Sequence, residues 1–473
     1  MKAALKRNPN SSGFTIVELL VVIVVIGILA AITIVVFTGI SQKARIATLQ
    51  YDLSGSANKL KLYYTEYGTF PQSLDTSSCP VGPADTRYCL QVTPGNVYTY
   101  TTSSPYKSFK LVITNTVSSL AYAVTDTTTP TVYVPPTGIL AALATPTIPA
   151  GANPHAVAIS ADGTSVYTTN SNGRTISMYS RDTGTGLLTA LATPTIATGT
   201  WPQGIIISSD GTSVYASNSN DNTISMYSRN TSTGALTALA TPTIATGASP
   251  WCIAISADGT SLYASNYNSN TISMYSRNTS TGALTALATP TITTSGSNPY
   301  GITVSPDGTS VYTVNQYNFS NTVAMYSRNT STGALTAQAT PTIATGSAPY
   351  GIAISNDGTS VYVTNMLSYS VSMYSRNTST GALTALATPS IATGGTQPQG
   401  IVVSSDGISV YADNYMSDTI AMYKRNTSTG VLTALGTPTV AAAGAYDLIM
   451  SPDGTSIYAA GYASNTILMY ARN

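Results

Sequence analysis

The sequence predicts a chain in two parts: an α+β stalk, built from a long N-terminal helix and a small antiparallel sheet, and then an all-β seven-bladed propeller. Two observations support this fold class. An apolar run from Leu19 to Phe37 follows a short basic leader. Farther along, an Asp-Gly turn recurs seven times at steps of 47 to 50 residues. An apolar run of this length predicts a membrane-spanning helix, and a repeat of this length is typical of propeller blades.

Composition narrows the classes of partner. Charged residues make up 8% of the chain, with 19 basic and 18 acidic side chains, against roughly 25% charged residues in ordinary domains. A balance this close to neutral lacks the positive field that binds phosphate backbones, so no nucleic acid partner is expected. The region after residue 137 has one His and no Glu. It holds no cluster of metal ligands, so neither a metal nor another cofactor is expected.

The N-terminal residues predict the topology of the chain in a membrane. Residues 1–13 form a polar leader with Lys2, Lys6 and Arg7, and basic segments remain on the cytoplasmic side of a membrane. Everything after Phe37 is therefore expected outside the cytoplasmic membrane. Glu18 stands at the edge of the apolar run, where a carboxylate is costly and is normally retained for a partner or a function.

The segment Gly13-Phe14-Thr15-Ile16-Val17-Glu18 resembles the N-terminus of type IV prepilins and pseudopilins. The resemblance covers residues 1 to about 130. It implies that a prepilin peptidase cuts between Gly13 and Phe14 and methylates the new Phe14 amine. It also implies that Glu18 pairs with the N-terminal amine of a neighbouring pilin subunit, and that the protein moves from the cytoplasmic membrane to a pilus or the cell surface. Many pilins carry a proline about twenty residues into the mature helix, where this chain has Ile34-Val35-Val36.

The helix is expected to extend over residues 14–68. Apolar residues at spacings of three and four form one stripe, which continues through Ile46, Leu49, Leu53, Ala57, Leu60 and Tyr64, and Gly68 to Pro71 ends it. A small β head is predicted over residues 69–130, because alternating segments occur at Val97–Thr101, Phe109–Thr114 and Leu120–Val124. Residues 131–136, which contain two consecutive prolines, are expected to form a stiff linker.

Three cysteines are present. Cys79 and Cys89 are close enough in sequence to close a small loop, and the predicted topology puts them in an oxidising compartment. A disulfide between them is favoured over buried thiols. Cys252 has no evident partner.

Residues 137–473 are predicted to form the propeller. Each repeat has four strands, as in Gly204–Ser208, Ser213–Asn218, Thr223–Arg229 and Ala235–Ile244. The last repeat ends at Asn473 without a fourth strand, whereas residues 137–148 align with the fourth strand of a complete repeat. An N-terminal outer strand is therefore expected to close the ring and remove its open edge.

The segment Val361-Tyr362-Val363-Thr364-Asn365 and its repeats resemble the YVTN repeat family. That family includes surface-layer propellers and is similar in fold to lactonase-like enzymes. The resemblance covers residues 137–473 and implies the fold rather than an activity.

A candidate ligand ring lies seven residues before each Asp-Gly turn, where the inner strand begins. Its members are His155, Gln203, Trp251, Tyr300, Tyr350, Gln399 and Tyr446. Aromatic faces with amides between them can stack on sugars and bind their hydroxyl groups, so a glycan or surface-protein ligand is one interpretation. The alternative is that these side chains fill the central channel.

Catalysis is not expected, because only His155 and Asp447 approach the channel mouth as titratable groups, and no catalytic residue is assigned. The repeated Asp is interpreted as a turn former and the repeated Arg as packing at a blade edge. The leading hypothesis is a pilin-like surface subunit that displays the propeller for adhesion or recognition. The alternatives are a pseudopilin or surface protein with a structural or protein-docking propeller, and a tethered lactonase-like hydrolase.

Overall fold

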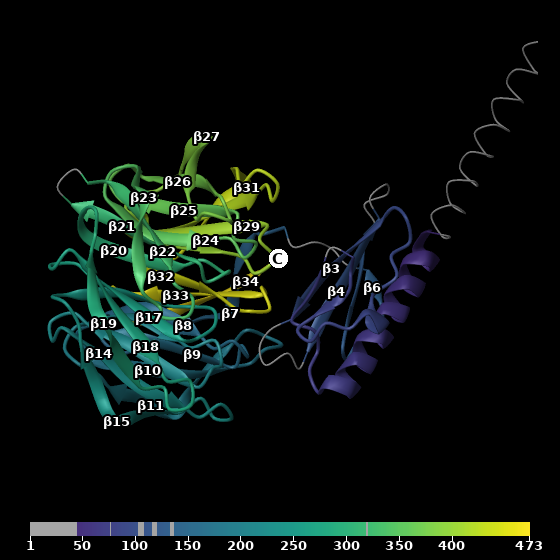
Figure 1. Ribbon diagram of the computed structural model, residues 1–473, viewed down its shortest axis with the longest axis horizontal. Helices are drawn as coiled ribbons and strands as arrows, with labels where there is room; N and C mark the ends of the chain where they lie inside the picture. The colour runs from purple at the N-terminus through teal and green to yellow at the C-terminus, as the bar shows by residue number, and fades with distance from the viewer. Residues whose placement is uncertain (1–44, 76, 103–107, 116–120, 133–136, 318–319) are drawn as a thin grey trace, which may run out of the picture. The chain divides into compact units, whose positions relative to one another are not determined.

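The computed structural model describes residues 45–75, 77–102, 108–115, 121–132, 137–317 and 320–473 (Figure 1). The predicted leader, the apolar run and the residues Gly13, Phe14 and Glu18 lie outside these ranges. Within them, no helix combines the length and the apolar character needed to cross a membrane. The chain divides into two compact units: Met1–Thr102 with Tyr106–Val134, and Pro135–Asn473 with Ser103–Pro105.

The N-terminal unit packs a helix over residues 45–67 against a four-stranded antiparallel sheet. The apolar stripe of the helix is buried in a shared core, in which Leu53 and Leu60 meet Leu111 and Ile113. The strands of the sheet, in order, are β3 (Asn96–Thr102), β4 (Phe109–Asn115), β5 (Ala121–Thr125) and β6 (Thr131–Val132). The predicted linker is too long at its start, because its first two residues form β6 and pair with β5.

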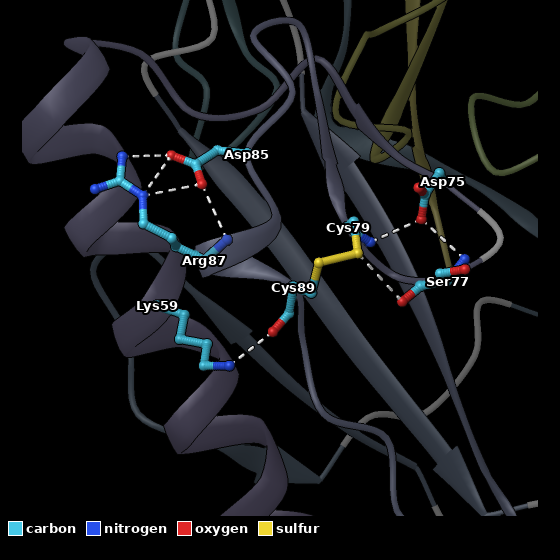
Figure 2. The surroundings of a disulfide bond; sticks show 7 residues. All are labelled: Lys59, Asp75, Ser77, Cys79, Asp85, Arg87 and Cys89. Carbon is cyan, nitrogen blue, oxygen red and sulfur yellow. Dashed lines mark hydrogen bonds and ion pairs between the residues drawn. A yellow bond between two sulfur atoms is a disulfide. The ribbon is translucent and has the colours of Figure 1, made fainter.

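A disulfide joins Cys79 to Cys89 beside this helix (Figure 2). The loop that it closes contains β2 (Pro80–Val81), which pairs with β1 (Ser73–Leu74), and a short 3-10 helix, η1 (Thr86–Tyr88). The Lys59 ammonium donates a hydrogen bond to the Cys89 carbonyl oxygen at 2.7 Å and so ties the loop to the helix. Hydrogen bonds from Arg87 hold the pKa of the Asp85 carboxyl below its usual range.

The C-terminal unit contains seven four-stranded antiparallel sheets, which we number as blades 1 to 7 in the chain order of their inner strands. In each blade the strands run inner, second, third and outer. Blades 1 to 3 are β8–β11 (Pro154–Ile159, Ser165–Asn170, Thr175–Arg181, Leu188–Ala197), β12–β15 (Pro202–Ile207, Ser213–Asn218, Thr223–Arg229, Leu236–Ala245) and β16–β19 (Pro250–Ile255, Ser261–Asn266, Thr271–Arg277, Leu284–Thr293). Blades 4 to 6 are β20–β23 (Ser297–Val304, Ser310–Tyr317, Thr322–Arg328, Leu335–Ala344), β24–β27 (Pro349–Ile354, Ser360–Asn365, Ser370–Arg376, Leu383–Ala392) and β28–β31 (Pro398–Val403, Ser409–Asn414, Thr419–Arg425, Leu432–Ala441), with a 3-10 turn η2 (Tyr415–Ser417) in blade 6.

Blade 7 draws its strands from both ends of the unit. Its strands are β32 (Ala445–Met450), β33 (Ser456–Gly461), β34 (Thr466–Arg472) and β7 (Leu140–Pro149). Arg472 lies opposite Leu140, as Arg229 lies opposite Leu236 in blade 2. The inner strand β32 also lies beside β8 of blade 1.

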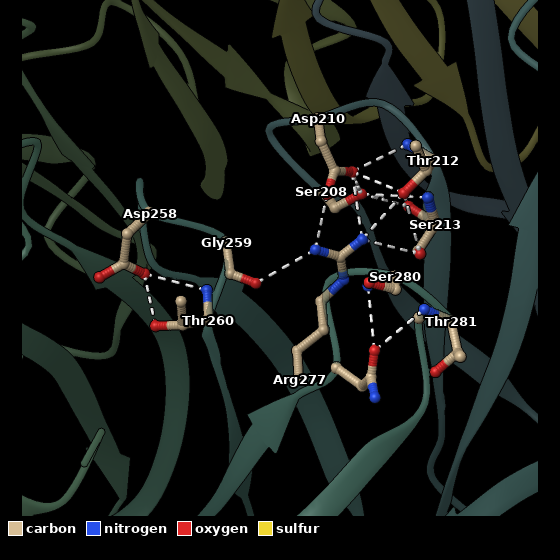
Figure 3. Close-up of polar contacts among 12 residues, drawn as sticks. Ser208, Asp210, Thr212, Ser213, Asp258, Gly259, Thr260, Arg277, Ser280 and Thr281 are labelled. Atoms are coloured by element: carbon tan, nitrogen blue, oxygen red, sulfur yellow. Dashed lines mark hydrogen bonds and ion pairs between the residues drawn. The ribbon is translucent and has the colours of Figure 1, made fainter. Parts of the chain in front are cut away.

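The repeated Asp and Arg form ion pairs between neighbouring blades. The Arg that ends each third strand reaches the Asp-Gly turn of the preceding blade at N···O distances of 2.7–3.0 Å, and its side chain is almost fully buried. In Figure 3, Arg277 meets Asp210 at 2.8 Å and donates to the Ser213 hydroxyl at 2.9 Å. The repeated Arg therefore has a structural role at the blade edge, as interpreted from the sequence, whereas its ion pair with the preceding blade was not predicted. The Asp also does more than form its turn, in which Asp210 accepts from the N–H of Thr212.

Candidate functional site

The seven residues of the candidate ligand ring lie at the starts of the seven inner strands, at the same end of the propeller. His155, Gln203, Tyr300, Tyr350 and Gln399 are buried, whereas Trp251 and Tyr446 are half-buried. Neighbouring aromatic side chains of this set are in contact. The ring centroid of His155 lies 4.5 Å from that of Tyr446, and the centroid of Trp251 lies 4.7 Å from that of Tyr300. The side chains therefore form a nearly continuous aromatic layer.

Three of these tyrosines form a chain of hydrogen bonds. The Tyr300 hydroxyl bonds to that of Tyr350, which donates to the Tyr446 hydroxyl at 2.7 Å. Burial raises the pKa of Tyr446 to about 12, so its hydroxyl stays protonated at neutral pH. At the end of this chain, the Tyr446 hydroxyl can donate its own hydrogen to a ligand.

A cavity of about 170 Å³ lies next to this layer. Five ring members line it, together with the next two residues of the inner strands. At the first of these positions, four blades have glycine. A Cβ on Gly204 would lie 2.9 Å from the Trp251 carbonyl oxygen, and one on Gly400 would lie 2.8 Å from the Asp447 Cα. Glycine thus permits the close approach of neighbouring inner strands around the cavity.

Cys252 and Asp447 occupy the same position in blades 3 and 7, and both face the cavity. Burial raises the pKa of the Asp447 carboxyl to about 7, although the N–H groups of Val157 and Leu448 donate hydrogen bonds to it. Burial likewise raises the pKa of the Cys252 thiol to about 12, so the thiol is neutral. Asp447 can therefore exchange a proton near neutral pH, which is the property that a general acid or base requires.

A second carboxyl group, that of Asp413, lies behind the cavity on the second strand of blade 6. It is fully buried and accepts hydrogen bonds from the N–H groups of Gln399 at 3.1 Å and Gly400 at 3.0 Å. Burial, and then repulsion from Asp447, raise its pKa well above the usual value. Both effects favour the protonated form of Asp413.

Several buried polar atoms of the ring have no hydrogen-bond partner within the described ranges: His155 Nδ1, Gln203 Oε1, Trp251 Nε1 and Gln399 Oε1. Burial lowers the pKa of His155 to about 3, against a hydrogen bond with the Gln203 backbone, so the imidazole is neutral. An uncharged imidazole that donates through one nitrogen accepts through the other. The ring thus presents acceptors from His155 and the two glutamines, and one donor from Trp251.

The structure brings all seven predicted ring residues together and adds acidic groups that sequence reasoning undervalued. Asp447 was noted near the mouth, but Asp413 was missed. A signal for Asp413 was present, because blades 1, 2, 3 and 5 have the hydroxyl residues Thr169, Ser217, Ser265 and Thr364 at its position. Among the residues that the structure describes, no group of three or more His, Cys, Asp or Glu side chains could hold a metal ion.

Two sequence families match the chain. The family described as "Lactonase, 7-bladed beta-propeller" matches residues 114–254, 243–344 and 335–473. The prokaryotic N-terminal methylation motif matches residues 8–34. The chain thus combines an N-terminal methylation motif of the type IV pilin kind with a seven-bladed propeller domain.

Curated relatives match the N-terminal part. The type IV major pilin protein PilE1 of Neisseria gonorrhoeae is 27% identical over 78 residues, which are 16% of this chain and 47% of the pilin. The chain therefore spans about half the length of the curated relatives that it matches.

Solved structures match the propeller. A putative 6-phosphogluconolactonase of Bacteroides fragilis aligns with a TM-score of 0.56 at 22% identity, covering 64% of this chain and 88% of that one. The periplasmic gluconolactonase PpgL of Pseudomonas aeruginosa aligns with a TM-score of 0.53 at 17% identity, covering 73% and 97%. At this identity the solved structures show the fold alone. The expectation that the protein is not an enzyme is nevertheless overturned, because the matching family is that of lactonases.

Proposed function

Because this chain belongs to the family of seven-bladed β-propeller lactonases, we propose that its propeller hydrolyses a small lactone in the central cavity, as a domain carried by a pilin-like N-terminal segment. One observation carries the proposal: Asp447 faces a cavity of about 170 Å³ with a pKa of about 7. A carboxyl group with this pKa exists in both protonation states at neutral pH, which suits a general acid or base in ester hydrolysis.

The reaction follows from the position of Asp447. The carboxylate removes a proton from a water molecule while the water oxygen bonds to the lactone carbonyl carbon. When the tetrahedral adduct collapses, the bond from this carbon to the ring oxygen breaks. The protonated Asp447 returns the proton to that oxygen, and the product is a hydroxy acid. The Tyr446 hydroxyl, which lines the cavity, is a donor that can stabilise negative charge developing on oxygen.

The proposal is tested by hydrolysis of a panel of small lactones by the full-length chain in detergent. Asp447→Asn is expected to lower kcat by at least about 100-fold, since a general base contributes about 10²–10⁴-fold. The matched control is Asp182→Asn. Asp182 is an exposed turn residue that accepts from the N–H groups of Gly184 and Thr185, and other blades have Asn there. Equal rates in the wild type and Asp447→Asn would contradict the proposed base.

The pH dependence separates Asp447 from His155. We expect kcat/KM to rise with pH through an inflection near 7, as Asp447 loses its proton. His155→Gln is expected to retain this inflection, because the pKa of His155 is about 3 and the imidazole does not titrate in this range. An inflection that disappears with His155 would assign the base to the imidazole instead.

A second candidate function is display of the propeller for adhesion, as a subunit assembled through its N-terminus. Exposed large apolar side chains support it: in the described propeller they are Trp201, Leu367, Tyr369 and Met416, exposed by 36–61%. All four lie in loops between second and third strands or between blades, which vary in sequence, whereas the opposite turns hardly vary. Exposed apolar residues gathered on one end of a domain favour a protein or glycan partner.

Binding of the full-length chain to whole cells and to a glycan array tests display. Leu367→Ser combined with Met416→Ser is expected to reduce binding several-fold while lactone hydrolysis stays unchanged, because neither residue lines the cavity. Unchanged binding in this variant would exclude the loops of blades 5 and 6 as the adhesive surface.

We also infer that β7 closes the ring of blades and connects the propeller to its anchor. The pairing of β7 with β34, the contact of β32 with β8 and the ion pair of Arg181 with Asp453 at 2.9 Å support closure. With β7 in place, the third strand β34 of blade 7 has no unpaired edge. The propeller is attached to the N-terminal unit through β7. Closure by this strand would hold the blades around the cavity together.

A further inference from the structure

The cationic side chains of the propeller are placed away from the cavity. Seven arginines are buried at the far ends of the blades, in ion pairs with the Asp-Gly turns. An inner strand of six residues separates these turns from the ligand ring by about 20 Å. The remaining two cations of the propeller, Arg174 and Lys424, are exposed, and among the described residues no Lys or Arg lines the cavity.

The titratable side chains at the cavity discussed above are acidic or neutral. Asp447 ionises near neutral pH and Asp413 lies behind it, whereas His155 is neutral because its pKa is about 3. Proteins recognise phosphate groups through Arg or Lys, whose charge compensates for lost hydration. In a cavity of this size, a phosphate dianion would meet a carboxylate at short range, where a poorly hydrated interior strengthens the repulsion.

The hydrogen-bond acceptors without a partner favour an uncharged ligand with O–H groups over a phosphorylated one. His155 and Gln399 both line the cavity, are exposed by only 7% and 4%, and have acceptor atoms without a partner in the described chain. Buried acceptors without a hydrogen bond are costly, so a ligand with O–H groups gains by supplying the missing donors. The aromatic ring of Tyr446, which also lines the cavity, offers a stacking surface for a sugar-like ring.

We propose that the cavity takes an uncharged, polyhydroxylated lactone and discriminates against its phosphorylated form. The proposal rests on the proposed function for the reaction, but the binding preference stands on the cavity itself. Phosphorylated lactones are the substrates named for some proteins of similar fold. Because no Lys or Arg is among the described residues that line the cavity, this chain is not expected to recognise a phosphorylated lactone.

The test uses the full-length chain and glucono-1,5-lactam, an uncharged analogue that cannot be hydrolysed as a lactone, with its 6-phosphate as the comparison. By calorimetry, the lactam is expected to bind at least tenfold more tightly than the phosphate. His155→Phe and Gln399→Met should each weaken lactam binding about tenfold, because each removes one buried acceptor. Asp182→Asn should leave it unchanged.

The outcomes separate the two proposals. Tighter binding of the phosphate, or no binding of the lactam, overturns the inference. Preferential hydrolysis of the 6-phosphorylated lactone overturns the inference and retains the lactonase function. Tight lactam binding without hydrolysis of any lactone retains the inference on ligand class and overturns the lactonase function.

Discussion

Asp413 occupies a position at which other blades use a hydroxyl group to join neighbouring inner strands. In blade 2, Ser217 accepts from the N–H of Gly204 at 2.9 Å and donates to the carbonyl oxygen of Trp251 at 2.7 Å. A carboxylate can accept but cannot donate, so Asp413 can replace this hydroxyl as a donor only when it is protonated. Burial and the repulsion from Asp447 favour that protonated form.

Protonation of Asp413 makes the stability of the propeller depend on pH. Because its folded-state pKa is raised, the stability that this proton contributes is complete below about pH 4. It is lost as the pH rises toward the folded-state pKa, at about 1.4 kcal/mol per pH unit. In Asp413→Ser the free energy of unfolding should fall less between pH 4 and pH 8 than in the wild type.

Urea unfolding followed by tryptophan fluorescence measures this effect, because both tryptophans lie in the propeller. The matched variant is Ser217→Asp, which places an acid at the equivalent position of blade 2, where the ring residue is also glutamine and the next residue glycine. Ser217→Asp should steepen the loss of stability with pH. Parallel pH profiles for wild type and Asp413→Ser would show that Asp413 is not protonated in the folded state.

At the scale of the element, each blade is bound to its neighbour by a buried arginine. Arg277 donates from Nε to the Tyr215 hydroxyl at 2.9 Å. It also donates from Nη1 to the Gly259 carbonyl oxygen at 3.2 Å and forms an ion pair with Asp210 (Figure 3). The same set recurs between blades 7 and 1, where Arg181 donates to Tyr458 at 2.6 Å. The contacts between neighbouring blades are therefore of the same kind at both of these interfaces.

Arg277→Met and Arg181→Met are expected to destabilise the propeller by similar amounts, about 3 kcal/mol each, because each removes one partner of a buried ion pair. Arg181 is the informative variant, since it joins the first and last blades. Chemical denaturation of both variants makes the comparison. A much smaller cost for Arg181→Met would contradict closure of the ring.

The disulfide acts at the same scale in the N-terminal unit (Figure 2). Its two cysteines are separated by 10 positions in the sequence, and closing a loop of this length stabilises a fold by roughly 2–3 kcal/mol. Replacing Cys79 and Cys89 together by Ser should speed amide exchange in the helix over residues 45–67. Hydrogen exchange with mass spectrometry measures this. Cys252→Ser is the control, because that free thiol lies in the propeller.

At the scale of the whole molecule, a methylation motif of the pilin kind and a lactonase-family propeller share one chain. We expect the mature protein to begin at Phe14 with a methylated amine, because the motif implies cleavage after Gly13. Mass spectrometry of the N-terminal peptide from the native host checks this expectation. Recovery of the chain with Met1 and an intact leader would contradict processing.

The role of Glu18 is tested in the same preparation. If Glu18 pairs with the amine of a neighbouring subunit, Glu18→Ala should be cleaved normally and yet enter filaments poorly, as fractionation of sheared surface material would show. Normal incorporation of Glu18→Ala would leave the protein as a membrane-anchored propeller without Glu18-dependent assembly.

The sequence by itself determined the two-part organisation and most of the strands. Thr223–Arg229 and Ser213–Asn218 were predicted with the bounds that the structure has. The prediction succeeded because the alternation of apolar and polar residues and the Asp-Gly turns are local properties of the sequence, and both recur in every repeat. It also indicated which residues begin the inner strands and so brought the seven ring residues together.

Only the tertiary structure decided which charged and titratable side chains form ion pairs and which are buried at the cavity. Arg277 and Asp210 are 67 residues apart in sequence, and their pairing depends on how one blade packs on the next, which no local pattern encodes. The same holds for Asp447, which the sequence places near the channel mouth with His155 but to which it assigns no catalytic role. Its raised pKa arises from burial, and burial of a carboxyl group is a property of the fold rather than of the sequence around it.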